Sequence, residues 1–166
     1  MAAPFRVVLL DAGHDRAQFT CGVGALDSYF HQQVTQDMRR RVTSCFVALD
    51  GDGEVVGCYT LAATSVVLRD LPPVIVKKLP RYPTVPAVRM GRLAVSVAHH
   101  GAGLGAALLA NALQRASRSE IAAFALVVDA KDAKAARFYA HHGLQPLLDA
   151  SLTMFIPLGS VKSLIA

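Results

Sequence analysis

Three glycines spaced two apart, Gly101, Gly103 and Gly105, are the residues of this sequence best suited to hold a ligand. They stand between a strand-like run and a segment in which leucines and alanines recur at helical spacing. The first amides of a helix have no acceptor within the helix, the helix dipole favours negative charge, and glycine lets an anion approach the backbone. The pattern therefore predicts a strand, a phosphate-binding turn and a helix in succession.

Two pyrophosphate cofactors fit this turn, and the glycine spacing alone does not separate them. Read from Gly101, the turn is G-x-G-x-x-A, which fits the fingerprint of a Rossmann dinucleotide domain. Read from His100, it is H-G-A-G-L-G, which is similar to the [QR]-x-x-G-x-[GA] loop that holds the pyrophosphate of coenzyme A in GNAT acetyltransferases. A Rossmann enzyme needs several more strand and helix units than can follow Asp129, the candidate ribose ligand. The order of elements therefore favours coenzyme A.

Length and composition favour one domain over residues 1–166, because 53% hydrophobic residues suffice for a substantial core. The formal net charge is +5, and from Leu71 to Ser119 there are seven basic residues and no acidic one. This acid-free block contains the glycine turn. It favours an anionic ligand, either a cofactor or a nucleic acid, over an ordinary solvated surface.

The cysteines and the apolar segments indicate a cytoplasmic protein without a metal or a membrane anchor. Cys21, Cys45 and Cys58 are odd in number and far apart, so we expect buried free thiols and no zinc site. The uncharged stretch from Leu93 to Gln114 contains two histidines and three glycines, which is not typical of a membrane span. Charged residues interrupt the N-terminal stretch, so no signal peptide is expected there.

Hydrophobic periodicity and turn residues predict a mixed α/β order. The motif D-G-D-G at Asp50 to Gly53 indicates a β-hairpin, and Pro80, Pro83 and Pro86 keep the connection before the glycine motif extended. Asp132 is expected to cap a helix that ends before Gly143. Strands are expected at Phe5–Leu10, Val42–Leu49, Glu54–Thr64, Val88–Val97, Ala122–Val128 and Leu152–Ile156, and helices at Leu26–Arg40, within Leu68–Lys78, at Leu104–Ser117 and at Asp132–His142.

Seven short motifs in one order resemble the GNAT family, and within it the acetyltransferase toxins of bacterial toxin–antitoxin modules. They are F-T-C-G-V-G-A-L-D-S-Y-F (19–30), G-C-Y-T-L (57–61), L-P-R-Y-P-T-V-P (79–86), G-R-L-A-V (91–95), V-D-A-K-D (128–132), R-F-Y (137–139) and G-L-Q-P-L (143–147). The resemblance spans the chain from its first strand to its last. It implies the GNAT fold, a central mixed β-sheet flanked by helices in which the fourth and fifth strands splay apart.

The resemblance also implies where acetyl-CoA binds. The pantetheine arm is expected to bond to the backbone of Leu93, Ala94 and Val95. The pyrophosphate is expected at His100, Gly101, Ala102, Gly103, Leu104, Gly105 and Ala106. Asp132 is expected both to cap its helix and to face the cofactor. His100 replaces the usual Gln or Arg, which predicts weaker or pH-dependent cofactor binding.

Tyr139, in R-F-Y, is the expected catalytic residue, because acetyl transfer expels a coenzyme A thiolate that a phenol can protonate. No base stands out. A free α-amine titrates near pH ~8, whereas lysine titrates near pH ~10.4, so the missing base agrees with an aminoacyl substrate.

The implied function is acetylation of the α-amine of aminoacyl-tRNA, which blocks translation. The implied partners are a ribbon-helix-helix antitoxin and a second copy of the chain. Five basic residues are candidates for holding tRNA phosphates, namely Lys77, Lys78, Arg81, Arg89 and Arg92. Two alternatives remain, a GNAT enzyme acting on a small-molecule amine or a protein N-terminus, and a non-catalytic module that binds coenzyme A or a nucleotide.

Overall fold

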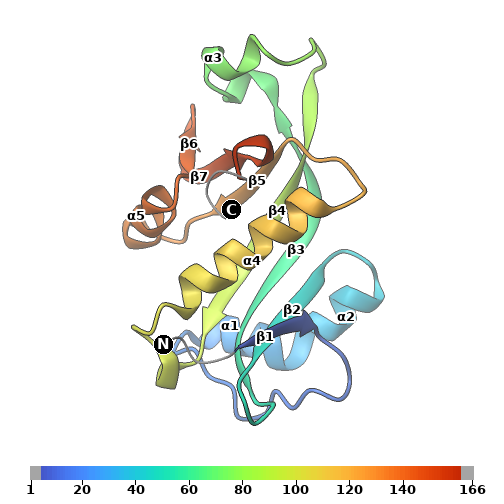
Figure 1. Cartoon of the computed structure of the whole chain (residues 1–166), viewed down its shortest axis with the longest axis vertical. Coiled ribbons are helices and arrows are strands. Elements are labelled where there is room, and N and C mark those ends of the chain that lie inside the picture. Colours follow the sequence, from blue (N-terminus) through green and yellow to red (C-terminus); the bar gives the residue numbers. More distant parts are fainter. Residues whose placement is uncertain (1–4, 162–166) are drawn as a thin grey trace. The chain divides into compact units, whose positions relative to one another are not determined.

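The computed structural model describes residues 5–161, whose strands and helices are labelled in Figure 1. The strands are β1 (Arg6–Leu9), β2 (Ser44–Leu49), β3 (Val55–Val67), β4 (Thr84–Val95), β5 (Ala125–Asp129), β6 (Gln145–Leu147) and β7 (Ala150–Pro157). The helices are α1 (Gly24–Ser28), α2 (Val34–Arg39), α3 (Pro73–Val76), α4 (Leu104–Arg118) and α5 (Ala133–His141). The strands are hydrogen-bonded in the order β1-β2-β3-β4-β5-β7-β6, with β4 and β5 parallel. The expected mixed sheet with flanking helices is thereby confirmed.

The described chain forms two compact units, and each draws on two separate stretches of sequence. The first unit takes residues up to Ala62 together with Gly91–Ala112. The second takes Ala63–Met90 and the residues from Leu113 onward. The expectation of one domain over residues 1–166 stays a prediction.

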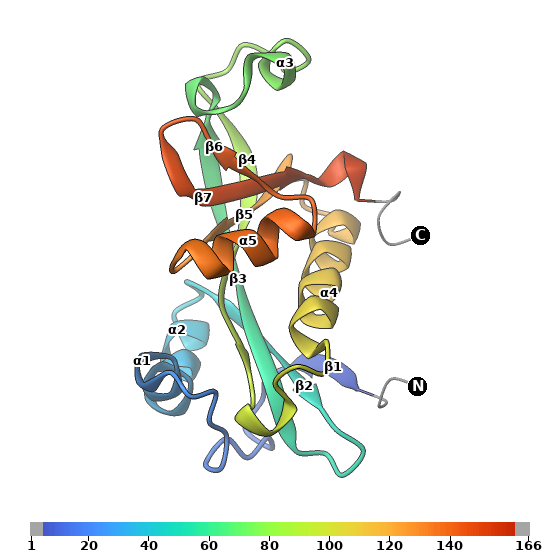
Figure 2. The ribbon, with the colours of Figure 1, turned by 90° about the vertical axis from the view of Figure 1, so that its left-hand side faces the viewer.

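The first unit contains β1, β2, the first part of β3 and the end of β4, and Figure 2 shows α1 and α2 on one face of these strands and the start of α4 on the other. Its core gathers Phe30 and Val34 of the helical segment against Cys45 and Cys58 of the strands, and all three cysteines of the chain are buried free thiols. On the opposite face a Cβ at Gly57 would lie 2.8 Å from Leu108 Cδ1. Glycine is therefore required where α4 crosses β3.

The second unit contains the parallel strands. Their register runs from Ala87 opposite Ala125 to Met90 opposite Val128, and β5 pairs antiparallel with β7. Its core includes Leu68, Val127 and Phe155, and the segment around α3 packs on it through Ile75, Val76 and Leu79. The ladder between β4 and β5 ends at Met90, so Leu93, Ala94 and Val95 are outside it.

Three details differ from the predicted elements. The helix expected at Leu26–Arg40 is interrupted by a π-helical turn at Tyr29–Gln33, which keeps the apolar spacing and so leaves no sequence signal. Strand β6 was missed because it has three residues and contains Pro146. Strand β4 starts four residues early, at Thr84, and Val97 lies in a 3-10 turn. No helix within residues 5–161 is both long enough and apolar enough to span a membrane.

Candidate active site

The glycine turn has the backbone geometry that an anion site requires. Gly101 and Gly103 have φ angles of +79° and +81°, and no atom lies within 4 Å of a Cβ built at either one. The positive φ, and not crowding, is therefore what demands glycine. The first bond into α4 runs from the Ala107 amide to the Gly103 carbonyl at 3.1 Å, so the amides of Leu104 to Ala106 have no acceptor within the helix. Glycine leaves these amides accessible.

His100, the predicted first residue of the pyrophosphate loop, bonds to the backbone at the end of β4. Its Nε2 lies 2.8 Å from the carbonyl oxygen of Val95, and a carbonyl only accepts, so Nε2 carries the proton. The ring thereby joins the turn to the end of β4. Its Nδ1 can donate to a phosphate only when the imidazole is protonated. The role of His100 as a pyrophosphate ligand stays a prediction.

The backbone just before the predicted pantetheine strand is irregular. Arg92 has a φ of +46°, which is unusual for a residue with a side chain, and a Cβ at Gly91 would lie 3.0 Å from Thr60 Oγ1. The Cys58 thiol donates to the Arg92 carbonyl at 3.9 Å. Ala94 is buried in the core of the first unit. This distortion fixes how Leu93, Ala94 and Val95 present their backbone groups.

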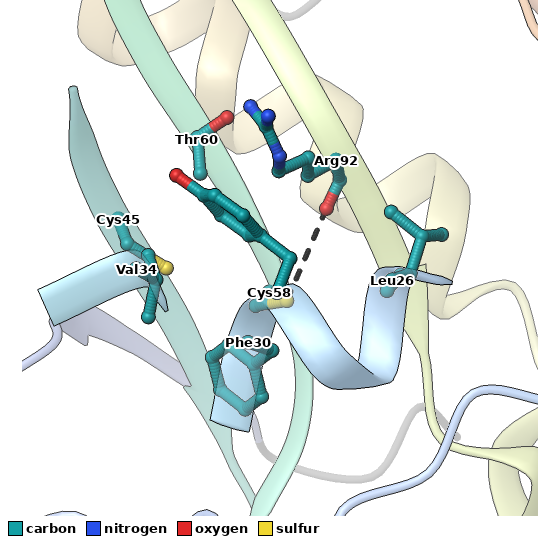
Figure 3. A pocket seen from close by; sticks show the side chains of 9 residues that line it. Leu26, Phe30, Val34, Cys45, Cys58, Thr60 and Arg92 are labelled. Carbon is teal, nitrogen blue, oxygen red and sulfur yellow. Dashed lines mark hydrogen bonds between the residues drawn. The ribbon is translucent and has the colours of Figure 1, made fainter. Parts of the chain in front are cut away.

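A small cavity lies beside this irregular segment, and Figure 3 shows the side chains that line it. Its volume is about 10 Å³, which is room for no more than one water. Nine residues from the helical segment and from β2, β3 and β4 line it, namely Leu26, Tyr29, Phe30, Val34, Cys45, Cys58, Thr60, Arg92 and Ala94. The cavity therefore holds no substrate in this conformation.

Arg92, a predicted phosphate ligand, packs on an aromatic ring. Its guanidinium carbon lies 3.7 Å from the centre of the Tyr29 ring, a cation–π contact. The Tyr29 hydroxyl donates to Asp37 Oδ2 at 2.7 Å, and Gln33 donates to Oδ1 at 3.0 Å. Burial and the bond to Asp37 raise the pKa of Tyr29 to about 12, while the bonds from Gln33 and Tyr29 lower the pKa of Asp37. The exposed guanidinium of Arg92 is thus held in one orientation.

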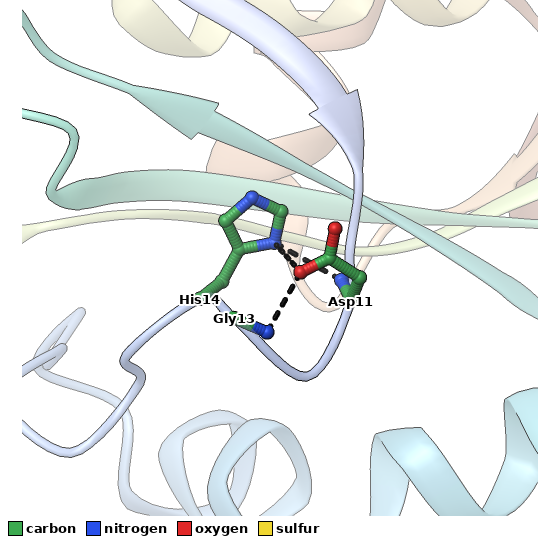
Figure 4. A network of polar contacts seen from close by, with 3 residues as sticks. All are labelled: Asp11, Gly13 and His14. Carbon is green, nitrogen blue, oxygen red and sulfur yellow. Dashed lines mark hydrogen bonds and ion pairs between the residues drawn. The ribbon is translucent and has the colours of Figure 1, made fainter.

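The loop after β1 is tied by local bonds, of which Figure 4 shows one group. Asp11 accepts from the Gly13 amide at 2.8 Å, and the Asp11 amide donates to His14 Nδ1 at 3.0 Å. Further on, Asp27 accepts from Thr20 at 2.8 Å and from the Cys21 amide at 2.9 Å. Burial opposes ionisation of Asp27, but these bonds outweigh it and lower its pKa. These carboxylates are used to fold the loop.

Tyr139 lies on α5 with its hydroxyl unengaged. Asp132 caps the helix by accepting from the Ala135 amide at 2.8 Å, which confirms the capping prediction. The Tyr139 side chain is buried, and within residues 5–161 no group hydrogen-bonds its hydroxyl. Burial alone raises its pKa to about 12. The phenol therefore stays protonated at neutral pH and has its proton available to a ligand.

The predicted phosphate ligands of the second unit fall into two groups. Arg89 forms an ion pair with Asp129, which also accepts from Thr153 at 3.0 Å. Lys77 and Arg81 instead line an open cavity of about 570 Å³, and Lys78 is exposed nearby in sequence. Arg92, the cofactor turn and Leu93 to Val95 belong to the first unit, whereas Tyr139 and Asp132 belong to the second.

Three residues with notable contacts are absent from the predicted site, namely Tyr29, Asp37 and Tyr82, and Asp129, considered only as a ribose ligand, pairs with Arg89. Tyr82 alone had a local signal, because it lies between two prolines in P-R-Y-P. The partners of Asp129 are distant in sequence, so no local pattern indicates them.

The mixed sheet, the glycine turn and the α5 tyrosine define an acyltransferase of the GNAT class. Residues 14–144 match the model of the Acetyltransferase (GNAT) family, and the chain belongs to this family.

Two curated relatives resemble most of the chain. One is "Probable toxin TacT" of Sinorhizobium fredii (strain NBRC 101917 / NGR234), 29% identical over 161 residues, with 91% of this chain and 89% of the relative covered. The other is "tRNA-acetylating toxin" of Mycobacterium tuberculosis (strain ATCC 25618 / H37Rv), 34% identical over 142 residues, with 84% and 82% covered.

Solved structures of a toxin named AtaT share the fold over nearly the whole chain. AtaT complexed with acetyl-methionyl-tRNAfMet is 28% identical, with a TM-score of 0.90 and 98% of this chain and 100% of that chain covered. AtaTR bound with acetyl-CoA is 27% identical, with a TM-score of 0.84 and 98% of both chains covered.

Proposed function

We propose that this protein is an acetyl-CoA-dependent N-acetyltransferase toxin that acetylates the α-amine of aminoacyl-tRNA and so blocks translation. The observation that carries the proposal is the likeness, over nearly the whole chain, to AtaT complexed with an acetyl-aminoacyl-tRNA. The relative named as a tRNA-acetylating toxin points the same way.

Acetyl-CoA supplies the acetyl group as a thioester, and two parts of this chain serve it. The open amides after Gly103 bind the pyrophosphate at the positive end of α4, with the backbone of Leu93 to Val95 along the pantetheine arm. The bond from His100 to the Val95 carbonyl holds the glycine turn against the end of β4. The first part binds and orients the cofactor.

Tyr139 supplies the proton. As the amine takes the acetyl group, the carbon–sulfur bond breaks and the sulfur leaves as a thiolate, which the Tyr139 hydroxyl protonates. A phenol whose pKa is about 12 is fully protonated at pH 7, so the acid form needs no activation. The amine needs no strong base, since an α-amine titrates near pH ~8 and the ester on the adjacent carbonyl lowers this pKa further. The nitrogen loses one proton to solvent as the amide forms, and the tyrosinate left on Tyr139 takes a proton back from solvent. Asp132 acts by fixing the start of the helix that carries Tyr139.

The same proposal includes the partners. We infer that an antitoxin of the ribbon-helix-helix class neutralises the protein, that the protein acts in the cytoplasm, and that it works as a homodimer. A structure of the AtaT toxin bound to the C-terminus of the antitoxin AtaR supports the antitoxin, because that toxin has a similar fold. Sedimentation of the purified chain, alone and with the product of an adjacent small gene, tests both interactions.

The first experiment is a transfer assay with radiolabelled acetyl-CoA and a pool of charged tRNAs, with deacylated tRNA as the control. We expect label on charged tRNA only, strongly reduced in Tyr139→Phe, and the labelled tRNA identifies the accepted amino acid. No label on any charged tRNA, despite tight acetyl-CoA binding, would overturn the proposal. Label on small amines or protein N-termini would then indicate another GNAT enzyme, and label on nothing a binding module.

A further inference from the structure

The segment around α3 carries an open cavity that the proposed acetyl transfer does not use. It has a volume of about 570 Å³, which is within the range of small-ligand pockets. Leu68, Val76 and Leu79 form its apolar floor, and these residues belong to or pack on the core of the second unit. The remaining lining residues are Pro73, Lys77, Arg81 and Tyr82. Among the described residues that line the cavity there is no carboxylate.

The local sequence holds Tyr82 in an exposed and rigid position. Tyr82 lies between Arg81 and Pro83, and its amide donates to the Pro80 carbonyl at 2.9 Å. A residue before proline is restricted to extended backbone, so little conformational freedom remains. The amide of Leu68 bonds the Pro83 carbonyl at 3.1 Å and closes the base of the segment. Although fixed in this way, the Tyr82 side chain is 65% exposed.

A large exposed aromatic ring beside two cations fits one kind of ligand better than others. Every nucleobase has a π-face that stacks on an aromatic side chain, and each nucleotide also carries a phosphate that lysine and arginine attract. We propose that this cavity binds an unpaired nucleobase of RNA, which stacks on Tyr82 while Lys77 and Arg81 contact the adjacent phosphates. Identifying that RNA as the single-stranded end of a tRNA rests on the proposed function.

Charge decides against the other occupants of such a cavity. A twofold-symmetric dimer whose axis passes through this patch would bring Lys77 and Arg81 close to their own copies, with no carboxylate among the described lining residues to offset them. The surrounding sequence, from Leu71 to Ser119, contains no acidic residue at all. An apolar protein segment would fill the floor but leave the two cations unpaired. An anionic ligand with flat rings can contact the apolar lining and Tyr82 and also pair with the two cations.

The test is direct RNA binding by the full chain, without acetyl-CoA and without an attached amino acid. The probe is a fluorescein-labelled single-stranded RNA octamer ending in CCA, and the same sequence in a blunt duplex is the comparison. We expect Tyr82→Ala to weaken single-strand binding by roughly 5- to 100-fold, the loss of one stacked base, with little effect on the duplex. Tyr82→Phe should bind like the wild type, whereas Tyr82→Leu should bind like Tyr82→Ala.

Two further variants test the charge and the surface. Lys77→Ala should reduce the slope of log affinity against log salt by about 0.7, the value for one phosphate contact in a single strand. Val74→Ala is the matched control, because Val74 is 68% exposed on α3 but does not line the cavity. It should bind RNA as the wild type does.

Several results would overturn the proposal. The first is that the wild type does not bind the single strand. The second is that Tyr82→Ala and the wild type bind it with equal affinity. The third is that Tyr82→Leu binds it with full affinity, which would indicate apolar contact and not stacking. Conversion of a dimer to a monomer by Tyr82→Ala in sedimentation would assign the surface to a second copy. Since binding is measured without the reaction, failure of the transfer assay disproves the proposed function and leaves this result standing.

Discussion

The groups proposed to meet a ligand are of different kinds in the two compact units. In the first unit, Tyr29, Asp27 and His100 are all engaged by other groups of the protein, and what remains open is the backbone of the glycine turn. In the second unit, the Tyr139 hydroxyl and the cations around Tyr82 have no protein partner among residues 5–161. The first unit thus offers backbone amides to a ligand, whereas the second offers Tyr139 and the cations around Tyr82, although Arg89 and Asp132 of that unit are engaged.

Tyr29 and Tyr139 show what this difference teaches. The pKa of each is raised to about 12, and by that measure either phenol is an equal candidate for catalysis. Tyr29 owes its raised pKa to burial together with a bond to Asp37, so its proton is already shared with a carboxylate. Tyr139 owes it to burial alone. The unengaged hydroxyl, and not the size of the pKa shift, is why we propose Tyr139 and not Tyr29 as the proton donor.

The largest expected effect comes from removing that donor. Tyr139→Phe should lower kcat by roughly 10²- to 10⁴-fold, the usual contribution of a general acid, and leave the Kd for acetyl-CoA unchanged. Tyr29→Phe should change kcat by less than about threefold, because its hydroxyl serves Asp37. Steady-state kinetics on charged tRNA measures kcat, and calorimetric titration of acetyl-CoA measures its Kd. An equal loss of kcat in both variants would contradict the distinction drawn between Tyr139 and Tyr29.

A smaller effect, on binding alone, is expected from the backbone of the first unit. Gly103→Ala places a side chain at a φ of +81°, which costs about 1–2 kcal/mol, so the turn relaxes from the shape that exposes its amides. The Kd for acetyl-CoA should rise roughly 5- to 30-fold, since each 1.4 kcal/mol is tenfold, with kcat at saturation unchanged.

Gly24→Ala is the matched control for this substitution. Gly24 begins α1, has no atom within 4 Å of an added Cβ and lacks the positive φ. Its variant should bind acetyl-CoA as the wild type does. If Gly103→Ala also left the Kd unchanged, the turn would not be the anion site.

The sequence predicts the structural features that depend only on residues close together in the chain. The glycine turn, the Asp132 cap and the position of Tyr139 on the capped helix all follow from spacings of a few residues, and the structure has the turn, the cap and the helix where expected. The π-helical turn after α1 leaves no signal, because apolar residues continue through it at spacings of three and four.

Contacts between distant residues explain the rest. The carboxylate that engages Arg89 is 40 residues away along the chain, so a sequence pattern shows the cation and not its partner. Arg92 likewise packs on Tyr29 from a different strand. A set of basic residues in sequence therefore overstates the number of free cations, because tertiary contacts decide which of them a ligand can reach.

The smallest expected effect is on stability, and it separates the two tyrosines without any ligand. A phenol titrates near pH ~10 in the unfolded chain and at about 12 in the fold for both residues. Between these values the unfolded chain holds fewer protons, so the free energy of unfolding falls as pH rises from 10 to 12. At pH 8 this contribution is complete, and only the hydrogen bonds differ. Tyr29→Phe should then lower Tm by about 2–4 °C through the lost bond to Asp37, while Tyr139→Phe should leave Tm unchanged.

At pH 11 Tyr139→Phe should melt above the wild type, because phenylalanine has no proton to lose on unfolding. Thermal melts followed by circular dichroism at the two pH values measure this, and a constant gap between wild type and Tyr139→Phe would show that the fold does not suppress ionisation of Tyr139.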